Sequence, residues 1–270
     1  MTEHEFLMNI AGEGQALGDL MLLQGTTAVP KDPWGGPTTI SGDDSDNTLY
    51  GDEGSNNIYG YGGNDTIWAS TGLDRIYGGD GNDYLSWREV GASDGYGNDY
   101  YGEDGNDTVV AGPGNDGLYG GAGNDSLSGS GGNDYCKGAS GNDTLDGGNG
   151  DDNLMGDWGS DTIYGGFGND TIVGGISRDI LAGEFGADTY HWRRGDGNDI
   201  IYELIDGASD VLFFESGIKR KDVKVRMNPG VNVTYTIKGQ NGGVITLRGG
   251  GDLLLKYADE APVVASSGNY

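Results

Sequence analysis

Residues 102–191 read as ten consecutive nonapeptides: GEDGNDTVV, AGPGNDGLY, GGAGNDSLS, GSGGNDYCK, GASGNDTLD, GGNGDDNLM, GDWGSDTIY, GGFGNDTIV, GGISRDILA and GEFGADTYH. Glycine dominates positions 1, 2 and 4, aspartate holds position 6, and position 8 is mostly aliphatic. Five more repeats fill residues 42–86, and WREVGA at 87–92 interrupts the period before it resumes. A fixed period over this length predicts a solenoid in which each repeat stacks on its neighbours.

The residue types at each position predict a tight turn followed by a short strand. Glycine at positions 1, 2 and 4 permits positive φ and close backbone approach. Positions 7 to 9 form the strand, with the side chain at position 8 pointing inward. A core one side chain deep is thin, so we do not expect hydrophobic burial alone to hold the fold. The predicted inward row is Leu49, Ile58, Ile67, Ile76, Leu85, Val109, Leu118, Leu127, Cys136, Leu145, Leu154, Ile163, Ile172, Leu181 and Tyr190.

Acidic residues gather in the repeats. The chain of 270 residues has a net charge of −28, and residues 42–191 hold 28 acidic and 4 basic residues, a net charge of −24. A glycine-rich chain this acidic stays disordered unless a counter-charge neutralises it. Aspartates recurring every nine residues offer oxygen ligands, which Ca²⁺ prefers. The same charge excludes nucleic acid as a partner, because phosphates would be repelled.

The repeat G-G-x-G-x-D-x-U-x, with U a large aliphatic residue, resembles the haemolysin-type calcium-binding nonapeptide of RTX (repeats-in-toxin) proteins over residues 42–202. GGAGNDSLS (120–128) and GGFGNDTIV (165–173) match every fixed position. The resemblance implies an all-β fold, a right-handed parallel β-roll (β-solenoid) with two repeats per coil. Aspartates of successive coils would then stack about 4.8 Å apart, with Ca²⁺ between them. Ten repeats give eight such pairs, so we expect about eight or more Ca²⁺ ions.

The predicted metal ligands are the aspartates of this row. Asn47 and Asn56 hold position 6 in the first two repeats, and an amide carbonyl without charge predicts weaker sites there. A one-residue slip in SDGYGNDYY (93–101) places Asp99 in the row. The full set of predicted ligands is Asp65, Asp74, Asp83, Asp99, Asp107, Asp116, Asp125, Asp134, Asp143, Asp152, Asp161, Asp170, Asp179, Asp188 and Asp199.

Three parts follow along the chain. Residues 1–41 are expected to cap the first coil, 42–202 to form the β-roll with its interruption near 87–92, and 203–270 to form a small antiparallel β cap. The apolar runs of the cap also resemble the segment that follows the repeats in RTX proteins. No apolar run reaches transmembrane length, and the first residues lack the basic region of a signal peptide. The resemblance implies a secreted, extracellular protein, exported by type I secretion from a Gram-negative bacterium with a C-terminal signal.

The sequence predicts a structural or adhesion module that folds on binding Ca²⁺ outside the cell. No catalytic triad, HExxH or phosphate loop occurs and 41 residues precede the repeats, so we expect no enzyme activity. An accessory or C-terminal part of a secreted enzyme or toxin is an alternative. Ice binding is another, through the hydroxyl row Thr108, Ser126, Thr144 and Thr162. A third is binding of an extracellular polysaccharide or cell surface through the position-9 aromatic residues Tyr50, Tyr59, Trp68 and Tyr77.

Overall fold

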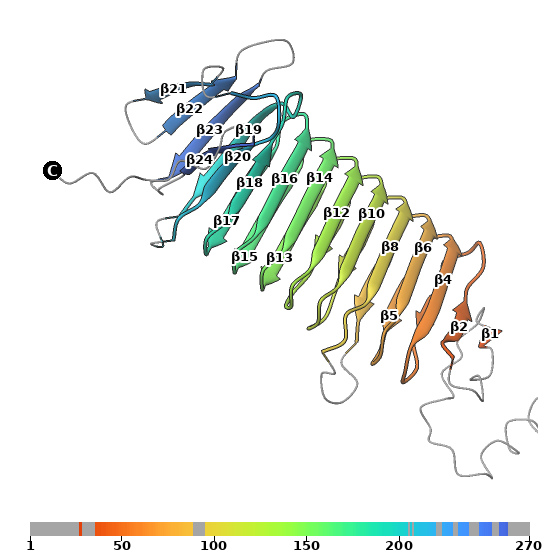
Figure 1. Ribbon diagram of the computed structural model, residues 1–270. Coiled ribbons are helices and arrows are strands. Elements are labelled where there is room, and N and C mark those ends of the chain that lie inside the picture. The colour runs from red at the N-terminus through yellow and green to blue at the C-terminus, as the bar shows by residue number, and fades with distance from the viewer. Residues whose placement is uncertain are drawn as a thin grey trace, which may run out of the picture.

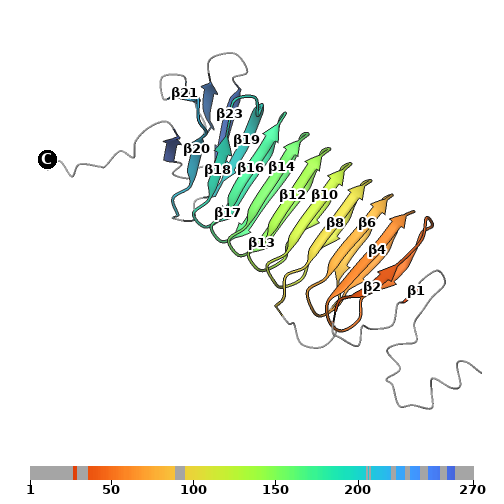
Figure 2. The same ribbon diagram turned by 45° about the vertical axis from the view of Figure 1, so that its right-hand side comes forward.

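The computed structural model describes residues 27–28, 36–88, 95–204, 206, 208–219, 223–228, 232–237, 243–249 and 254–258. Their secondary structure consists of strands, which form two twelve-stranded sheets. The strands are stacked along one axis, so the molecule is an elongated solenoid (Figures 1 and 2). No helix long and apolar enough to cross a membrane occurs in the described residues.

The two sheets take alternate strands of the chain. The first contains, in spatial order, β1 (Thr27–Ala28), β2 (Thr38–Ser41), β4 (Asn56–Gly62), β6 (Arg75–Asp80), β8 (Asp99–Asp104), β10 (Gly117–Ala122), β12 (Tyr135–Ser140), β14 (Asn153–Trp158), β16 (Thr171–Ile176), β18 (Thr189–Trp192), β20 (Val211–Phe214) and β24 (Leu254–Tyr257). The second contains β21 (Val223–Asn228), β22 (Asn232–Ile237), β23 (Val244–Gly249), β19 (Asn198–Glu203), β17 (Ile180–Phe185), β15 (Thr162–Phe167), β13 (Thr144–Asn149), β11 (Ser126–Ser128), β9 (Thr108–Val110), β7 (Tyr84–Trp87), β5 (Thr66–Ala69) and β3 (Thr48–Tyr50).

Strand pairing confirms the parallel β-roll with two repeats per coil. Within the repeats each strand pairs in parallel with the strand one coil later, as Leu118 does with Cys136 in β10 and β12. Equivalent residues of neighbouring coils are therefore 18 positions apart. The side chains at position 8 all fall on the inner face, because strand residues alternate between faces.

The predicted inward row is the core of the roll. Every one of its members is at most 3% exposed. Tyr100, Ile40, Ile201 and Leu212 extend the row and are also buried. Ile40 lies in β2, which pairs in parallel with β4, so the parallel stack already begins at Thr38, a few residues before the expected start of the roll. The core remains a single stack of side chains between the sheets.

The turns use glycine for two different reasons. Positions 2 and 4 lie in the left-handed region, as at Gly121 (φ 111°) and Gly123 (φ 136°). Position 1 has an ordinary φ, and its glycine is required by close packing, described below. Ser177 holds position 4 of its repeat with φ 101°, where the preceding coils have Gly159 and Gly141 (both φ 138°). A non-glycine residue in this region stores backbone strain.

The interruption after Trp87 is an insertion between two coils. Across it the stacking distance along the chain rises from 18 to 24 residues. β7 ends at Trp87 and β8 begins at Asp99, while residues 89–94 lie outside the described part of the chain. Tyr100 is buried in the inward row. The repeat SDGYGNDYY therefore keeps its frame, and the expected one-residue slip is wrong.

The two ends of the roll are closed by different strand arrangements, and the C-terminal one differs from the predicted antiparallel cap. β1 pairs antiparallel with β2 at the first end, and the rest of residues 1–35 lies outside the described chain. The C-terminal cap is mixed rather than purely antiparallel. β20 and β24 continue the first sheet in parallel, and β23 continues the second in parallel to β19. Only β21, β22 and β23 form the predicted antiparallel ribbon among the described strands.

Ser177→Gly is expected to stabilise the roll. Relief of left-handed strain of about 1–3 kcal/mol, offset by the entropy of glycine in the unfolded chain, leaves a net gain of about 1 kcal/mol. Urea unfolding in saturating Ca²⁺ measures it. Ser126→Gly in β11, where φ is ordinary, is the matched control and is expected to lose about 0.5–1 kcal/mol. A lower urea midpoint for Ser177→Gly would contradict the strain.

Candidate metal centre

The aspartates at position 6 form a ladder along each side of the roll. In each, Oδ1 accepts the backbone N–H of the position-6 residue one coil earlier. The nitrogen–oxygen distance is 2.9 Å from Asp107 to Asp125, 2.8 Å from Asp125 to Asp143 and 2.7 Å from Asp134 to Asp152. Stacked carboxylates are thus linked through a backbone N–H. A Ca²⁺ ion between the carboxylates of successive coils stays a prediction.

The second carboxylate oxygen of most ladder aspartates is buried without a hydrogen-bond partner. A buried carboxylate that lacks compensation is costly, so such an oxygen marks the place of an absent proton or cation. The unpartnered Oδ2 recurs at position 6 in coil after coil, so it is a regular feature of the repeat and not a local irregularity. The oxygens are Oδ2 of Asp65, Asp83, Asp107, Asp125, Asp134, Asp143, Asp152, Asp161, Asp170 and Asp179.

Each of these oxygens lies in a cradle beside the position-1 glycine of its own repeat. A Cβ on Gly102 would collide with Oδ2 of Asp107 and with the carbonyl oxygen of Gly120 in the next coil. The same pair of oxygens, one carboxylate and one carbonyl, surrounds Gly129 and Gly165. Position 1 is therefore glycine because two oxygen ligands converge on the space where a side chain would begin.

The donor set of the cradle suits Ca²⁺. No group of three or more His, Cys, Asp or Glu side chains converges anywhere in the described chain. A cation in a cradle would be held by one carboxylate oxygen and by backbone carbonyls. Such an all-oxygen set favours Ca²⁺, which accepts carbonyl ligands in flexible geometry, over Zn²⁺ or copper.

Comparison with known proteins agrees with this geometry. The profile described as RTX calcium-binding nonapeptide repeat (4 copies) matches residues 35–67, 59–86, 101–136, 136–163 and 155–190. The chain belongs to the RTX repeat family. RTX nonapeptide repeats bind calcium, and secretion is characteristic of the family.

Two further comparisons do not refine the family assignment. No curated protein matches the chain. A solved structure that resembles it is the crystal structure of extracellular lipase LipA from Serratia marcescens, at 19% identity and a TM-score of 0.27. That match covers 74% of this chain and 38% of the lipase, so the chain spans well under half of the lipase's length.

Burial governs the electrostatics of the RTX ladder. Desolvation raises the pKa of Asp134 and Asp179 from 3.8 to about 8. It raises the pKa of Asp107 to about 7 and that of Asp125 to about 6, and the stacked Asp125 and Asp143 carboxylates add smaller repulsive contributions to these two groups. The donated backbone N–H opposes the rise in each case without cancelling it. Without a metal, Asp134 and Asp179 therefore favour the protonated form at neutral pH, whereas Asp125 does so only below about pH 6.

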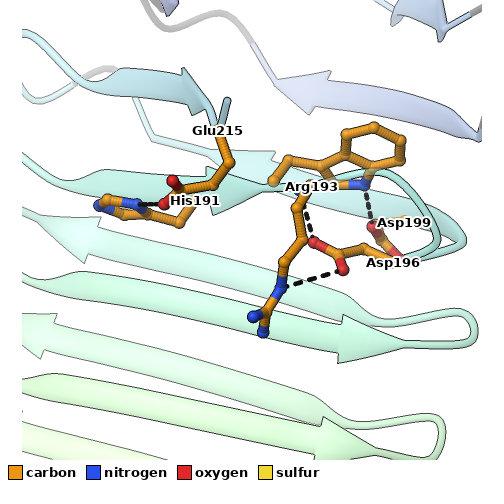
Figure 3. A network of polar contacts seen from close by, with 6 residues as sticks. His191, Arg193, Asp196, Asp199 and Glu215 are labelled. Carbon is orange, nitrogen blue, oxygen red and sulfur yellow. Dashed lines mark hydrogen bonds and ion pairs between the residues drawn. The ribbon is translucent and has the colours of Figure 1, made fainter. Parts of the chain in front are cut away.

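Two predicted ligands stand in the ladder but have a hydrogen-bond partner at Oδ2. Oδ2 of Asp74 accepts the backbone N–H of Ser70 at 3.2 Å, and position 1 of that repeat is alanine, Ala69. Oδ2 of Asp199 accepts the indole N–H of Trp192 at 2.8 Å (Figure 3). Asp188 is buried and accepts the N–H of Asp170. Asp116 also lies in the row, in a repeat that begins with Ala111.

Asp99 is the predicted ligand that the structure places outside the ladder. It pairs in register with Arg75 at position 7 and forms an ion pair with its guanidinium at 3.4 Å. Asn98 holds the ladder position instead, accepting the N–H of Asp74 at 2.9 Å. The error came from the assumed one-residue slip. Without the slip, position 6 of residues 93–101 is Asn98, as the structure has it.

Sequence reasoning also missed the end of the ladder and a second, outer ladder. Asp210 accepts the N–H of Asp188 at 3.0 Å, and the sequence DVL at 210–212 repeats the aspartate-to-aliphatic spacing that could have revealed it. One residue before many of the ladder aspartates, exposed asparagines accept the N–H of their counterparts in the next coil. Asn106 and Asn124 pair in this way at 2.7 Å. These amides brace the turns outside the cradles.

The predicted aromatic contacts lie on both faces of the roll. Tyr59 and Tyr77 stack on the first sheet with ring centroids 4.9 Å apart, and Tyr101 and Tyr119 continue the stack at 4.8 Å. Tyr50 and Trp68 pair in register on the second sheet. Glycan contact by these residues stays a prediction. Stacking restricts it on the first sheet, because each inner ring face is already covered by the next ring.

The hydroxyl row of the second sheet is in register as expected. Ser126 pairs with Thr108 and Thr144, and Thr144 pairs with Thr162. The neighbouring position-9 row places Val110, Ser128 and Asp146 side by side. Ice binding by this face stays a prediction.

The metal-free roll is expected to gain stability on acidification. The ladder carboxyls titrate near 3.9 when unfolded, and burial raises the pKa of Asp125 to about 6 and of Asp134 to about 8 in the fold. Groups with raised folded pKa values contribute stability below pH 4 that is lost as the pH rises through 6 to 8. Far-UV circular dichroism in a chelator at pH 8, 6 and 5 measures the β signal and, at each pH where the roll is folded, its Tm. A Tm that rises with pH in the chelator would contradict it.

Proposed function

We propose that this protein is a secreted RTX module whose β-roll folds on binding an array of Ca²⁺ outside the cell, where it serves as a structural or adhesive element. The observation that carries the proposal is the row of buried Oδ2 atoms without partners, each beside the position-1 glycine of its repeat. Ten such cradles are consistent with the expectation of about eight or more Ca²⁺ ions.

Calcium would supply the free energy that the core lacks. The inward row is one side chain deep, while residues 42–191 carry a net charge of −24. Each Ca²⁺ would compensate a desolvated carboxylate and join two successive coils. Because the unfolded chain has no preformed cradle, binding free energy becomes folding free energy. The chain would stay extended where Ca²⁺ is scarce and fold where it is millimolar.

Type I secretion from a Gram-negative bacterium fits this switch, with the signal in the C-terminal segment. Family membership supports export, and the negative charge of the calcium-free repeats would keep the chain extended during transport. The repeat solenoid fits a non-catalytic module. The alternative of an accessory or C-terminal part of a secreted enzyme or toxin uses the same calcium-dependent fold.

A calcium titration of metal-stripped protein tests the folding switch. Far-UV circular dichroism is expected to show a cooperative gain of β signal with Ca²⁺ and none with equimolar Mg²⁺. Mg²⁺ demands octahedral geometry and dehydrates reluctantly, which a cradle of backbone carbonyls does not satisfy. A full β spectrum in chelator at pH 7.5, unchanged by Ca²⁺, would falsify the proposal.

A single methyl group tests the cradle itself. In Gly120→Ala the new Cβ would collide with Oδ2 of Asp125, so this site is expected to lose its ion. Stability in saturating Ca²⁺ should fall by about 1–3 kcal/mol, the cost of a buried polar group left unsatisfied. Native mass spectrometry counts the ions and urea unfolding gives the stability.

Gly131→Ala is the matched control for this substitution. Its φ is not in the left-handed region, and the nearest atom to the new Cβ, Nδ2 of Asn149, is 3.9 Å away. It should keep the ion count and stability of the parent. Equal ion counts for Gly120→Ala and Gly131→Ala would place the calcium elsewhere.

A further inference from the structure

A hollow of about 400 Å³ opens at the ends of β7, β9 and β11 in the second sheet. Its volume falls in the range of small-molecule sites, about 300–1,000 Å³. None of its lining residues is charged, although the surrounding repeats carry a net charge of −24. We call it the Trp87 groove. Its lining residues are Ser86, Trp87, Val110, Ala111, Gly112, Pro113, Ser130, Gly131 and Asn149.

The groove exists because the repeat pattern fails here. Trp87 occupies position 1, where most repeats hold glycine or alanine. The adjoining strands β9 and β11 end at position 9, whereas β13, β15 and β17 continue to position 3 of the following repeat. Small residues at the ends of the short strands then leave space beside the indole. The groove is thus made by departures from the calcium-binding consensus.

Trp87 forms the wall of the groove. A Cβ on Gly112 would lie 2.7 Å from Cγ and Cδ2 of the indole, so the ring packs directly against the Gly112 backbone. The side chain is half-buried and lines the hollow, which leaves part of the ring accessible. This differs from the stacked tyrosines of the first sheet, where neighbouring rings cover each other's faces.

Neutral polar groups form the rim. The Ser130 hydroxyl donates to the carbonyl of Ala111 at 2.9 Å, and the Asn149 amide donates to the carbonyl of Ser130 at 3.3 Å. These internal bonds fix both side chains. A hydroxyl oxygen and an amide oxygen still have lone pairs available as acceptors, and the amide keeps a second N–H. The rim therefore offers acceptors and a donor at fixed places.

We propose that the Trp87 groove binds a pyranose unit of a neutral polysaccharide. The C–H face of a sugar ring carries partial positive charge and packs on the negative face of an indole. Hydroxyls at the ring edge would bond to Ser130 and Asn149. The absence of charged lining residues suits a neutral sugar, and the acidic surroundings repel a polyanion. No ladder aspartate lines the groove, and the proposal goes beyond the folding function.

Binding of neutral hexasaccharides to the full calcium-loaded chain tests the groove. Cellohexaose, maltohexaose, mannohexaose and chitohexaose are titrated by calorimetry and by tryptophan fluorescence. At least one is expected to bind, with affinity at least tenfold weaker in Trp87→Ala. Trp158→Ala, which removes a tryptophan that is 67% exposed and outside the groove, should bind as the parent does.

Gly131→Leu provides a second variant that fills the groove without removing the indole. The nearest atom to a Cβ at Gly131 is 3.9 Å away and φ is ordinary, so a side chain can begin there without a clash. It is expected to lose binding at least tenfold and decides the question if Trp87→Ala does not fold. Circular dichroism in the same Ca²⁺ buffer verifies folding separately from binding. The proposal is overturned if folded parent binds none of the four sugars, or if Gly131→Leu binds as tightly as the parent.

Discussion

A buried carboxylate oxygen with no protein partner is the constraint on which this structure depends. The ladder aspartates use Oδ1 to accept a backbone N–H from the coil before, which fixes the turn and draws Oδ2 into the interior of the bend. The price of that geometry is desolvation, visible in the pKa of Asp134 rising to about 8. A proton would relieve it at low pH, and in the proposed function Ca²⁺ would relieve it at neutral pH while also joining two coils. The thin hydrophobic row between the sheets would then be sufficient because the turns are held in this way.

The same constraint explains why position 1 is so sensitive. Gly102, Gly129 and Gly165 each leave room for two converging oxygens. Ala69 adds a methyl group in a repeat whose Asp74 carboxylate accepts a protein N–H instead. At the first coils Asn47 and Asn56 remove the charge altogether, and their amides close the turn by accepting the N–H groups of Asp43 and Asp52. At the other end the Trp192 indole takes over the free oxygen of Asp199 (Figure 3). At both ends of the ladder, therefore, the side-chain oxygen at position 6 has a hydrogen-bond donor from the chain itself and does not depend on a cation.

The sequence predicted the parts of the molecule that follow from period alone. A nine-residue repeat with one inward side chain allows a single register, so Leu118 over Cys136 and the whole inward row followed directly. It failed where the period changes. An insertion after Trp87 suggested a slip that placed Asp99 in the ladder, but burial of Tyr100 holds the frame and puts Asn98 there. The sequence also could not predict the role of each carboxylate oxygen. The pattern showed that aspartates stack, but which oxygen accepts a backbone N–H and which stays without a partner depends on the direction of the N–H bonds, which no residue pattern reports.

Strict repetition and local departure from it have opposite physical effects on the surface. Where the repeat is exact, each side chain faces its own copy one coil away, so rings cover rings, as from Tyr59 to Tyr119, and amides bond to amides. The ring faces and hydrogen-bonding groups of such rows already contact one another, so few of them are available to a ligand. A ligand site requires groups that have no copy beside them. In the described part of the second sheet this condition is met at Trp87, because Ala111 and not a second tryptophan stands one coil later, and short strands leave the indole beside Gly112. The calcium array therefore depends on the regularity of the chain, and recognition of anything other than calcium is expected where that regularity ends.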